Sequence, residues 1–469
     1  MSKQQYDLVI VGAGAGGLIA AGFAVQLGAK VAIVEKGRIG GDCTWTGCVP
    51  SKALLKAAKV AHDVRTAAQY GIMSNAPVTD MSKVHEYLDK AIQQIYKATT
   101  PEELRHKGMD VYLGPARFVD NASILAGEKT IRSKHFLITT GARPLIPPID
   151  GLANVPYLTY EHIFDNKELP RSMIAVGGGP ISAEIAQAYQ RLGSQVTVVT
   201  DCLLPKEDPD VRQMLQDVLE REGVRFVWGR ATAARKEGET VVVSTGKEEA
   251  RGELLLVASG RRPTVDGLDL EKAGVNYTQE GIKVDDKLRT NVKNIFAAGD
   301  VLGGYQFSHF AGWQAFQAVR NALLPGSSSG LTHLVPWVTF TDPEIAHVGA
   351  TEAEARLRFG EQLKVCRWDL RKVDRAVCEN DQEGFIKIIA KRDGTILGAS
   401  IVGQRAGETI AEIVIAMKQK LTINDLAGTI HAYPTYSTGV QLLAVEMTIE
   451  KLLSGASGKI VRKLSQMVR

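Results

Sequence analysis

One pattern occurs twice in this chain and limits the folds open to it: an apolar run, a glycine-rich turn, a helical stretch and a second apolar run. The first copy runs from Tyr6 to Glu35, and the second begins at Ser172 and ends near Val199. Each copy therefore predicts a strand, a helix and a second strand. In such a unit the free N–H groups at the helix start face the turn and favour a phosphate group. The repeat predicts an α/β chain with two nucleotide-binding domains.

The first glycine turn matches a dinucleotide-binding pattern. Gly12, Gly14 and Gly17 have the spacing G-x-G-x-x-G, and Glu35 follows eighteen residues after the last glycine. This spacing predicts a diphosphate at the helix N-terminus, with the Glu35 carboxylate accepting a hydrogen bond from a ribose hydroxyl. An ordinary glycine turn is the alternative, and the strand, helix and acid in their expected order argue against it.

The second turn departs from this pattern at one position. Gly177 and Gly179 are present, but Ser182 stands where the third glycine belongs, and serine is small enough for close packing of the helix on the strand. Asp201 follows the second strand, next to the position that holds the acid in the first copy. Because a carboxylate there repels a 2′-phosphate, the sequence favours NADH over NADPH. Lys206 offers a cation that would instead accommodate NADPH.

Two of the five cysteines, Cys43 and Cys48, lie five residues apart in a glycine-rich segment. In a regular helix their Cα atoms would be about 8 Å apart, beyond disulfide reach, so a bridge requires a distorted turn at Gly47. A helix that begins near Cys48 lowers the pKa of that thiol, and Lys52 one turn later adds positive charge. Two buried cysteines or half of a zinc site are the alternatives. We expect no metal site, because the other three cysteines are isolated.

Charge and composition argue against several classes of protein. The net charge is +4, but residues 451–469 hold five basic residues and no acidic one, so the rest of the chain sums to −1. No basic stripe with interleaved aromatic residues occurs, and we expect no nucleic-acid partner. The run 8–25 is apolar, but its glycines would destabilise a lone helix, so we expect no membrane span. Residues 1–7 are polar and unlike a secretion signal, and we expect a cytoplasmic protein.

Proline and glycine residues mark the expected domain boundaries. Pro147, Pro148 and Gly151 indicate one boundary, and the Pro-, Gly- and Ser-rich stretch 325–330 is typical of a linker. From residue 331 onward, alternating strands and a helix around 407–419 indicate an α+β domain. The fold class is thus α/β, with two Rossmann-like domains and a C-terminal α+β domain. We predict a first nucleotide-binding domain at 1–150 that returns at 281–330, a second at 151–280, and the C-terminal domain at 331–469.

Several segments resemble the motifs of one family. The segment from Gly40 to Lys52, which contains both close cysteines, is similar to a redox-active disulfide segment. In chain order, it and four further segments resemble the class I pyridine nucleotide–disulfide oxidoreductases, the family of glutathione reductase, lipoamide dehydrogenase and mercuric reductase. The four further segments are Thr140–Pro144 with Gly141, Ala258–Pro263 with Gly260, Thr290–Asp300 with Gly299, and Pro336–Gly349.

This resemblance implies the cofactors and the roles of the site residues. The first domain would hold FAD, with Asp300 hydrogen-bonded to the ribityl chain, and the second NADH or NADPH. Cys48 would be the sulfur beside the flavin, and Cys43 the interchange thiol that meets a small-molecule electron acceptor. Lys52 would pair with Glu184 beside the flavin, where a cation stabilises reduced flavin and thiolate. An ordinary surface ion pair is the alternative. The chain would form a homodimer with the active site shared between subunits.

One segment departs from the disulfide-reducing members, which carry His-Pro-Thr-x-x-Glu near the C-terminus. Tyr433 stands in the place of the histidine that protonates the leaving thiolate, and Thr438 in the place of the glutamate. A phenol, with a pKa of about 10, is a poor base at neutral pH. Tyr433 and Pro180 are features of mercuric reductases, but residues 463–469 lack the cysteine pair of those enzymes. We expect His431 to be structural, and a face shared with Tyr433 is the alternative.

These features predict a mercuric-reductase-like enzyme that passes two electrons from NAD(P)H, through flavin and dithiol, to Hg(II) or a related soft acceptor. A disulfide reductase of the glutathione or lipoamide type, or a quinone reductase, is one alternative, and a flavin-binding redox sensor is another. The basic tail carries Ile460, Val461, Leu464 and Met467 at near-helical spacing. We expect it to be solvated and to pack on the partner subunit, and a helix on a membrane surface is the alternative.

Overall fold

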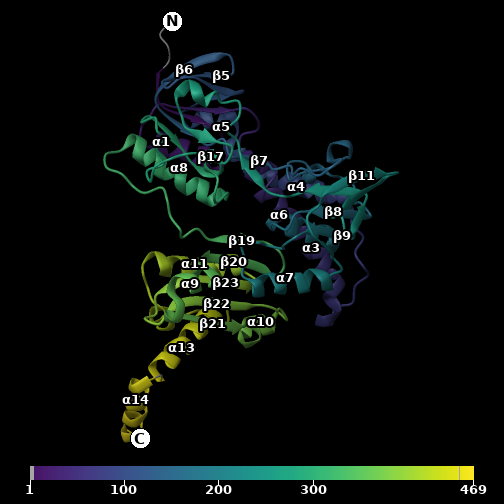
Figure 1. Ribbon diagram of the computed structural model, residues 1–469, viewed down its shortest axis with the longest axis vertical. Helices are drawn as coiled ribbons and strands as arrows, with labels where there is room; N and C mark the ends of the chain where they lie inside the picture. Colours follow the sequence, from purple (N-terminus) through teal and green to yellow (C-terminus); the bar gives the residue numbers. More distant parts are fainter. Residues whose placement is uncertain (1–4, 454, 469) are drawn as a thin grey trace. The chain divides into compact units, whose positions relative to one another are not determined.

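The computed structural model describes residues 5–453 and 455–468. These residues form two compact units (Figure 1). Both units combine helices with sheets, which confirms the α/β fold class. The N-terminal unit holds the chain up to residue 202 together with 223–332, and the C-terminal unit holds 203–222 together with the chain from 333 onward.

The largest sheet of the N-terminal unit is built on the first repeat. Its parallel strands run in the order β3, β2, β1, β6, with β18 also paired to β6, and the antiparallel strands β5 and β4 extend it. β1 and β2 are buried along nearly their whole length, as parallel strands covered on both faces usually are. The strands are β1 (Gln5–Val11), β2 (Val31–Glu35), β3 (Met109–Leu113), β4 (Ala116–Asp120), β5 (Ser123–Ala126), β6 (Lys129–Ile138) and β18 (Ile295–Ala297).

Two helices far apart in sequence pack together beside this sheet. α1 (Ala15–Gln26) follows the first glycine turn, and α8 (Ser308–Leu323) follows β18. Phe23 of α1 stacks on Phe316 of α8, with ring centroids 4.2 Å apart. β18 and α8 therefore bring a late part of the chain back to the first strand–helix–strand unit.

A second parallel sheet is built on the second repeat, in the order β10, β9, β8, β14. α6 (Pro180–Leu192) connects β8 to β9, so both predicted strand–helix–strand units are present. An antiparallel sheet of β11, β12 and β13 and two short antiparallel pairs accompany it. The strands are β7 (Ala142–Pro144), β8 (Ser172–Val176), β9 (Gln195–Thr200), β10 (Arg225–Trp228), β11 (Ala233–Glu237), β12 (Thr240–Ser244), β13 (Glu249–Gly252), β14 (Leu254–Val257), β15 (Arg261–Pro263), β16 (Tyr277–Thr278) and β17 (Gly281–Ile282).

The close cysteines lie in a helical segment between β2 and β3. Its helices are α2 (Gly41–Trp45), α3 (Cys48–Thr66), α4 (Met81–Tyr96) and α5 (Pro101–His106). Only two residues separate α2 from α3, so Cys43 and Cys48 are on different helices that nearly touch.

The C-terminal unit is an antiparallel sheet covered by helices. The strand order is β19, β20, β23, β22, β21. The strands are β19 (Trp337–Thr339), β20 (Glu344–Gly349), β21 (Leu363–Asp369), β22 (Phe385–Lys391) and β23 (Ile396–Gly403), and the helices are α7 (Pro209–Arg221), α9 (Glu352–Phe359), α10 (Asp374–Cys378), α11 (Ala406–Lys418), α12 (Ile423–Ala427), α13 (Thr438–Leu453) and α14 (Gly455–Val468).

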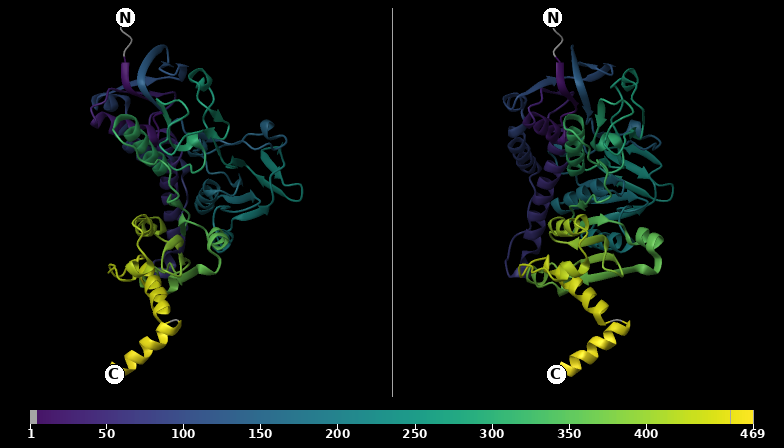
Figure 2. Two further views of the ribbon diagram at one scale, coloured as in Figure 1. Left: turned by 60° about the vertical axis from the view of Figure 1, so that its left-hand side comes forward. Right: turned by 90° about the vertical axis from the view of Figure 1, so that its left-hand side faces the viewer.

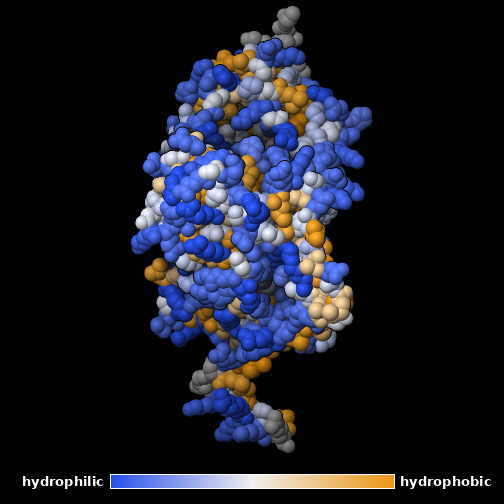
Figure 3. Space-filling model, turned by 90° about the vertical axis from the view of Figure 1, so that its right-hand side faces the viewer, coloured by the Kyte–Doolittle hydropathy of each residue, from blue (hydrophilic) through white to orange (hydrophobic). Residues whose placement is uncertain are grey.

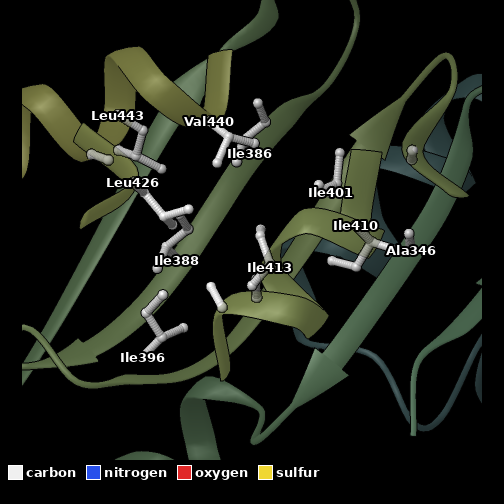
Figure 4. Packing of buried hydrophobic residues seen from close by; sticks show 14 of the residues in the cluster. Ala346, Ile386, Ile388, Ile396, Ile401, Ile410, Ile413, Leu426, Val440 and Leu443 are labelled. Carbon is white, nitrogen blue, oxygen red and sulfur yellow. The ribbon is translucent and has the colours of Figure 1, made fainter. Parts of the chain in front are cut away.

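The core of this unit forms where α11, α12 and α13 cover the sheet. Figure 4 shows Ile386 and Ile388 of β22 directed toward Val440 of α13 and Leu426 of α12. Ile413 of α11 belongs to the same buried cluster. Aliphatic side chains from one sheet and three helices thus fill one continuous core.

The segment 203–222, which includes α7, belongs to the C-terminal unit although it falls within the predicted domain 151–280. Lys387 of β22 has a side chain only 3% exposed and donates to Asp208 (2.8 Å) and Asp210 (2.7 Å). Trp337 of β19 donates its indole N–H to Glu207. The predicted boundaries at 150, 280 and 330 stay predictions. Across the two described stretches, no helix is long and apolar enough to cross a bilayer.

Candidate active site

The first glycine turn uses each of its three glycines for a different reason. Gly12 has φ +103°, and a Cβ there would overlap the Thr139 carbonyl. A Cβ on Gly17 would overlap the Gly12 carbonyl, where α1 packs on the turn. A Cβ on Gly14, in contrast, would meet only the Cα of Gly41, at an ordinary 3.8 Å. Contacts within the protein therefore do not require glycine at position 14. A bound diphosphate that approaches the backbone would require it, because a Cβ would keep the phosphate away.

The predicted ribose-binding acid is fixed beside this turn. Glu35, the last residue of β2, accepts a hydrogen bond from the Ala13 N–H at Oε2 (2.7 Å) and from the Gly37 N–H at Oε1 (2.7 Å). Both carboxylate oxygens are thus oriented by the backbone. The contact with a ribose hydroxyl stays a prediction.

The cysteine segment packs directly against the first glycine turn. Gly41 has φ +58°, and a Cβ there would lie 2.7 Å from the Cα of Gly14. Gly47 breaks the helix between the cysteines, and a Cβ there would lie 2.8 Å from the Asp42 carbonyl oxygen. The distorted turn that the sequence predicts at Gly47 is therefore present. Gly41, two residues before Cys43, thus contacts the loop that would hold the diphosphate.

The two sulfurs are in hydrogen-bond contact and are not covalently bonded. The hydrogen bond with Cys43 lowers the pKa of Cys48 to about 6, with smaller contributions from Ser308 and the Lys52 cation. The Cys48 sulfur lies 3.5 Å from the Ser308 hydroxyl oxygen. The same bond raises the pKa of Cys43 well above its usual value, and burial raises it further. These opposite shifts favour the thiolate at Cys48 and the thiol at Cys43.

The ion pair predicted between Lys52 and Glu184 is present. Lys52 on α3 donates to Glu184 Oε2 on α6 at 2.9 Å, with the Glu184 side chain 8% exposed and that of Lys52 37% exposed. The carboxylate is thus largely removed from water, while the cation keeps one side open and contributes to the lowered pKa of Cys48. An exposed surface pair would have neither property. Their role beside a flavin stays a prediction.

An arginine whose role no sequence motif indicated connects the cysteine segment to Asp300, the residue predicted to contact the flavin. Arg261 donates to Asp300 (2.8 Å) and to Asp42 (2.6 Å), which directly precedes Cys43, and Tyr160 also donates to Asp42 (3.2 Å). Burial disfavours the Arg261 charge, but the neighbouring carboxylates raise its pKa above the usual value. Burial also raises the pKa of Asp300, although Arg261 opposes this effect. No local spacing signals this network, because its members are far apart in sequence.

In the second glycine turn, as in the first, one glycine is packed against a carbonyl and another is open. A Cβ on Gly177 would overlap the Ala258 carbonyl, whereas a Cβ on Gly179 would have no neighbour within 4 Å. Ser182, in the third glycine position, is fully buried, as close helix packing requires. Its hydroxyl has no hydrogen-bond partner among the residues that the structure describes. Gly179 therefore stands where Gly14 stands in the first turn, open to a ligand.

The acid predicted to select NADH is paired with a cation that sequence reasoning missed. Arg230 donates to Asp201 at 2.6 Å, and this bond lowers the pKa of Asp201. Both side chains are at least half exposed. An arginine at this position is a usual partner of a 2′-phosphate. Asp201 thus favours NADH and Arg230 favours NADPH, and the choice between the two cofactors stays a prediction.

The remaining predicted cofactor glycines lie at strand ends of the N-terminal unit. Gly141 directly precedes β7, and Gly260 directly precedes β15, which pairs with β7. Gly299 follows β18, and its N–H donates to Gln314 of α8 at 2.9 Å. This bond fixes the loop that carries Asp300.

Tyr433 and His431 lie in the C-terminal unit and have different partners. Tyr433 is 72% exposed and donates its hydroxyl to Asp374 at 2.6 Å, and this bond raises the pKa of the phenol. His431 is nearly buried, with Nε2 2.8 Å from a Glu412 oxygen and Nδ1 3.0 Å from the Thr429 carbonyl. Both ring nitrogens are engaged, which agrees with the structural role expected for His431. Asp374 and Glu412 were not identifiable from the sequence, since neither lies near these residues in the chain.

The residues of the N-terminal unit fit a dinucleotide in each of the two glycine turns. The fit rests on the open positions at Gly14 and Gly179, each at a helix N-terminus, and on the backbone-oriented carboxylate of Glu35. Within residues 5–453 and 455–468, no group of three or more His, Cys, Asp or Glu side chains could hold a metal ion.

Comparison with known families gives two matches. Residues 6–315 match the family described as pyridine nucleotide-disulphide oxidoreductase. Residues 335–444 match the dimerisation domain of the same family. Together the two matches cover most of the chain.

Individual relatives agree with these matches. A mercuric reductase of Streptomyces lividans is 35% identical over 458 residues, which cover 94% of this chain and 96% of that protein. A dihydrolipoyl dehydrogenase of Haloferax volcanii is 35% identical over 454 residues, covering 92% and 94%. The structure of the HOCl-induced flavoprotein disulfide reductase RclA from Escherichia coli is similar with a TM-score of 0.84 at 28% identity, covering 94% and 99% of the two chains.

Proposed function

Because this chain belongs to the pyridine nucleotide-disulphide oxidoreductase family, we propose that it passes two electrons from NAD(P)H through its Cys43–Cys48 pair to Hg(II) or a related soft acceptor. As a member, it is an FAD-dependent oxidoreductase that uses NAD(P)H. The acceptor and the roles of the named residues are the proposed part.

The observation that carries this proposal is the asymmetric thiol pair. The lowered pKa of Cys48 favours its thiolate at neutral pH. Thiolates are soft ligands that bind soft metal ions in preference to hard ones. A thiolate with a second thiol in hydrogen-bond contact offers two sulfur ligands to one metal ion.

The acceptor step balances with these two sulfurs. Cys48 binds Hg(II) as its thiolate, and Cys43 releases its proton to solvent as it binds, so two S–Hg bonds form. Two electrons then pass to the metal, which leaves as Hg(0), and Cys43 and Cys48 become joined by an S–S bond. NAD(P)H supplies the hydride equivalent that restores the Cys43 thiol and the Cys48 thiolate, and NAD(P)⁺ leaves. FAD, when bound, supplies the hydride-accepting chemistry between the nicotinamide and the dithiol.

The chain's own residues orient and charge this pair. Ser308 and Cys43 surround the Cys48 sulfur, and the Lys52 cation, held by Glu184, favours its thiolate. Arg261 bonds both Asp42 and Asp300, which fixes the segment before Cys43 relative to the loop that would contact the flavin. Each contact stabilises either the position or the charge of a reacting sulfur.

Tyr433 favours a metal ion over a disulfide as the acceptor. Reduction of a disulfide needs an acid that protonates the first leaving thiolate. The Tyr433 hydroxyl already donates to Asp374, and its pKa is raised, so it is a poor proton donor. His431 is held by Glu412 and the Thr429 carbonyl within its own unit. Reduction of Hg(II) releases a proton and requires no such acid.

We also propose that the chain forms a homodimer, since residues 335–444 match the family's dimerisation domain. In that arrangement Tyr433 would face the partner subunit's site. Its 72% exposure in one chain leaves its ring available to such a contact.

An acceptor panel tests the proposal. NAD(P)H oxidation is measured under identical conditions with Hg(II), glutathione disulfide, lipoamide and a water-soluble quinone. We expect Hg(II) to give the highest kcat/KM. We expect Cys43→Ser to lower Hg(II) turnover by about a hundredfold or more, because one of two metal ligands is lost. The matched control Cys366→Ser, on β21 of the C-terminal unit, should retain wild-type turnover.

Two results would contradict the proposal. If glutathione disulfide or lipoamide is reduced faster than Hg(II), the enzyme is a disulfide reductase with an unusual proton donor. If Cys43→Ser and wild type reduce Hg(II) equally fast, electrons do not pass through the dithiol.

A further inference from the structure

The C-terminal helix α14 has two chemically different faces. Its apolar face consists of residues at spacings of four, seven and eight, which line up on one side of a helix. These side chains are Ile460, Leu464, Met467 and Val468, which are 60%, 55%, 74% and 89% exposed. Such large exposures, side by side, are unusual for a face that stays in water.

Basic residues border this apolar face of α14 on one side. Lys459 and Lys463 are one turn apart, Arg462 lies between them, and the two lysines are exposed. From residue 451 to 469 the sequence contains five basic residues and no acidic one. These cations therefore have no carboxylate on the same segment to pair with.

α14 is attached to the rest of its unit at one end. Gly458 is buried against the carbonyl of Leu453, the last residue of α13, and Arg462 donates to the same carbonyl at 2.9 Å. Figure 2 shows α14 continuing beyond α13, away from the sheet of the C-terminal unit. Figure 3 shows hydrophobic and hydrophilic side chains together on this segment, at the lower end of the picture. The helix is thus presented outward, with its apolar face open.

We propose that α14 docks this protein on a membrane surface rich in anionic phospholipid. The acyl region covers the apolar face, and the lipid phosphates pair with the basic residues beside it. A helix of fourteen residues is about 21 Å long, shorter than the roughly 30 Å hydrocarbon core of a bilayer. It therefore lies in the interface rather than spanning the membrane.

A second copy of α14 is a poorer occupant of the same face. Two such helices packed through their apolar faces would place Lys459, Arg462 and Lys463 of each chain beside those of the other. No acidic residue of the segment would relieve this repulsion, whereas anionic lipid neutralises it.

Sedimentation with lipid vesicles tests the proposal on the full-length holoenzyme. We expect the protein to sediment with vesicles that contain phosphatidylglycerol, and to remain in the supernatant with vesicles of phosphatidylcholine alone. Raising the salt from about 0.1 M to about 1 M should release it, since the Debye length falls from about 10 Å to about 3 Å.

Two tail variants and one control separate the contributions. The double variant Lys459→Glu, Lys463→Glu should weaken vesicle partitioning by at least about tenfold, because two attractive charges become repulsive. Ile460→Glu with Leu464→Glu should abolish partitioning. The control Lys90→Glu, Lys247→Glu reverses two exposed lysines of the N-terminal unit and should bind as wild type does. Retained flavin absorbance in each variant shows that the rest of the chain is folded.

Two outcomes would overturn the proposal. The first is wild-type protein that does not distinguish anionic from neutral vesicles. The second is a combination of two results: wild type does not bind vesicles, and light scattering gives the variant Ile460→Glu, Leu464→Glu the mass of a smaller oligomer than wild type. A second chain, rather than lipid, would then cover the apolar face.

Discussion

At the scale of single residues, the chemistry depends on which of two neighbouring sulfurs carries the charge. The Cys48 thiolate is favoured first by the hydrogen bond that Cys43 donates, and only then by Ser308 and Lys52. The sequence could predict a low pKa at Cys48, because a helix start and a lysine one turn later are local features. It could not rank the causes, since Ser308 is 260 residues away.

This ranking predicts unequal effects for two substitutions of Cys43. Cys43→Ala removes the donor and should raise the pKa of Cys48 from about 6 toward the usual thiol value. Cys43→Ser keeps a hydroxyl donor and should raise it less. The rate of Cys48 alkylation against pH gives the midpoint in each variant. Equal midpoints for alanine and serine would show that the hydrogen bond is not the main cause.

A second residue-scale prediction concerns the nicotinamide cofactor. Asp201→Asn removes the carboxylate that pairs with Arg230, so the guanidinium becomes available to a 2′-phosphate. We expect the ratio of kcat/KM for NADPH to that for NADH to rise by about tenfold. Arg230→Gln should lower the same ratio. If neither variant changes it, this pair does not contact the cofactor's adenosine ribose.

At the scale of secondary-structure elements, the glycine turns were the most predictable part of the molecule. Gly12, Gly14 and Gly17 lie within six residues, so their spacing reports local backbone geometry that tertiary packing rarely overrides. The Arg261 network was not predictable, because Arg261, Asp42 and Asp300 lie far apart in sequence and only the fold brings them together. His431 and Glu412 show the same limit in the C-terminal unit.

The glycine turn yields a prediction that separates binding from folding. Gly14→Ala places a Cβ at 3.8 Å from its nearest neighbour, so the fold should tolerate it while FAD affinity falls by about tenfold or more. Gly17→Ala overlaps the Gly12 carbonyl and should lower stability itself. Apoprotein melting and FAD titration measure the two effects. Comparable loss of melting temperature in both variants would contradict this division of roles.

For the whole molecule, the grouping of one segment depends on contacts between residues far apart in the chain. Residues 203–222 follow the second repeat in the chain yet belong to the unit that contains residues from 333 onward. The buried Lys387 ammonium contributes to this grouping, since it bonds Asp208 and Asp210 of that segment. A contact between residues 177 positions apart leaves no trace in local composition or periodicity.

Lys387→Met therefore tests how strongly this segment is held. The substitution leaves the Asp208 carboxylate, 3% exposed, without its cation and should cost about 3–5 kcal/mol of unfolding free energy. Burial opposes the Lys387 charge, but Asp208 and Asp210 raise its pKa overall. The contribution is therefore fully present below the pKa of an unfolded lysine and is lost as pH rises through the folded value. Denaturant unfolding at neutral and strongly alkaline pH measures it, and a cost that does not shrink at alkaline pH would contradict this account.

Anaerobic titration of the purified enzyme with NADH or NADPH shows whether Cys43 and Cys48 relay electrons from the flavin. We expect a two-electron-reduced form with a long-wavelength absorption band that requires the Cys48 thiolate and is missing in Cys48→Ser. A wild-type enzyme that is reduced without forming this band, or the same band in Cys48→Ser, would contradict relay through the two cysteines.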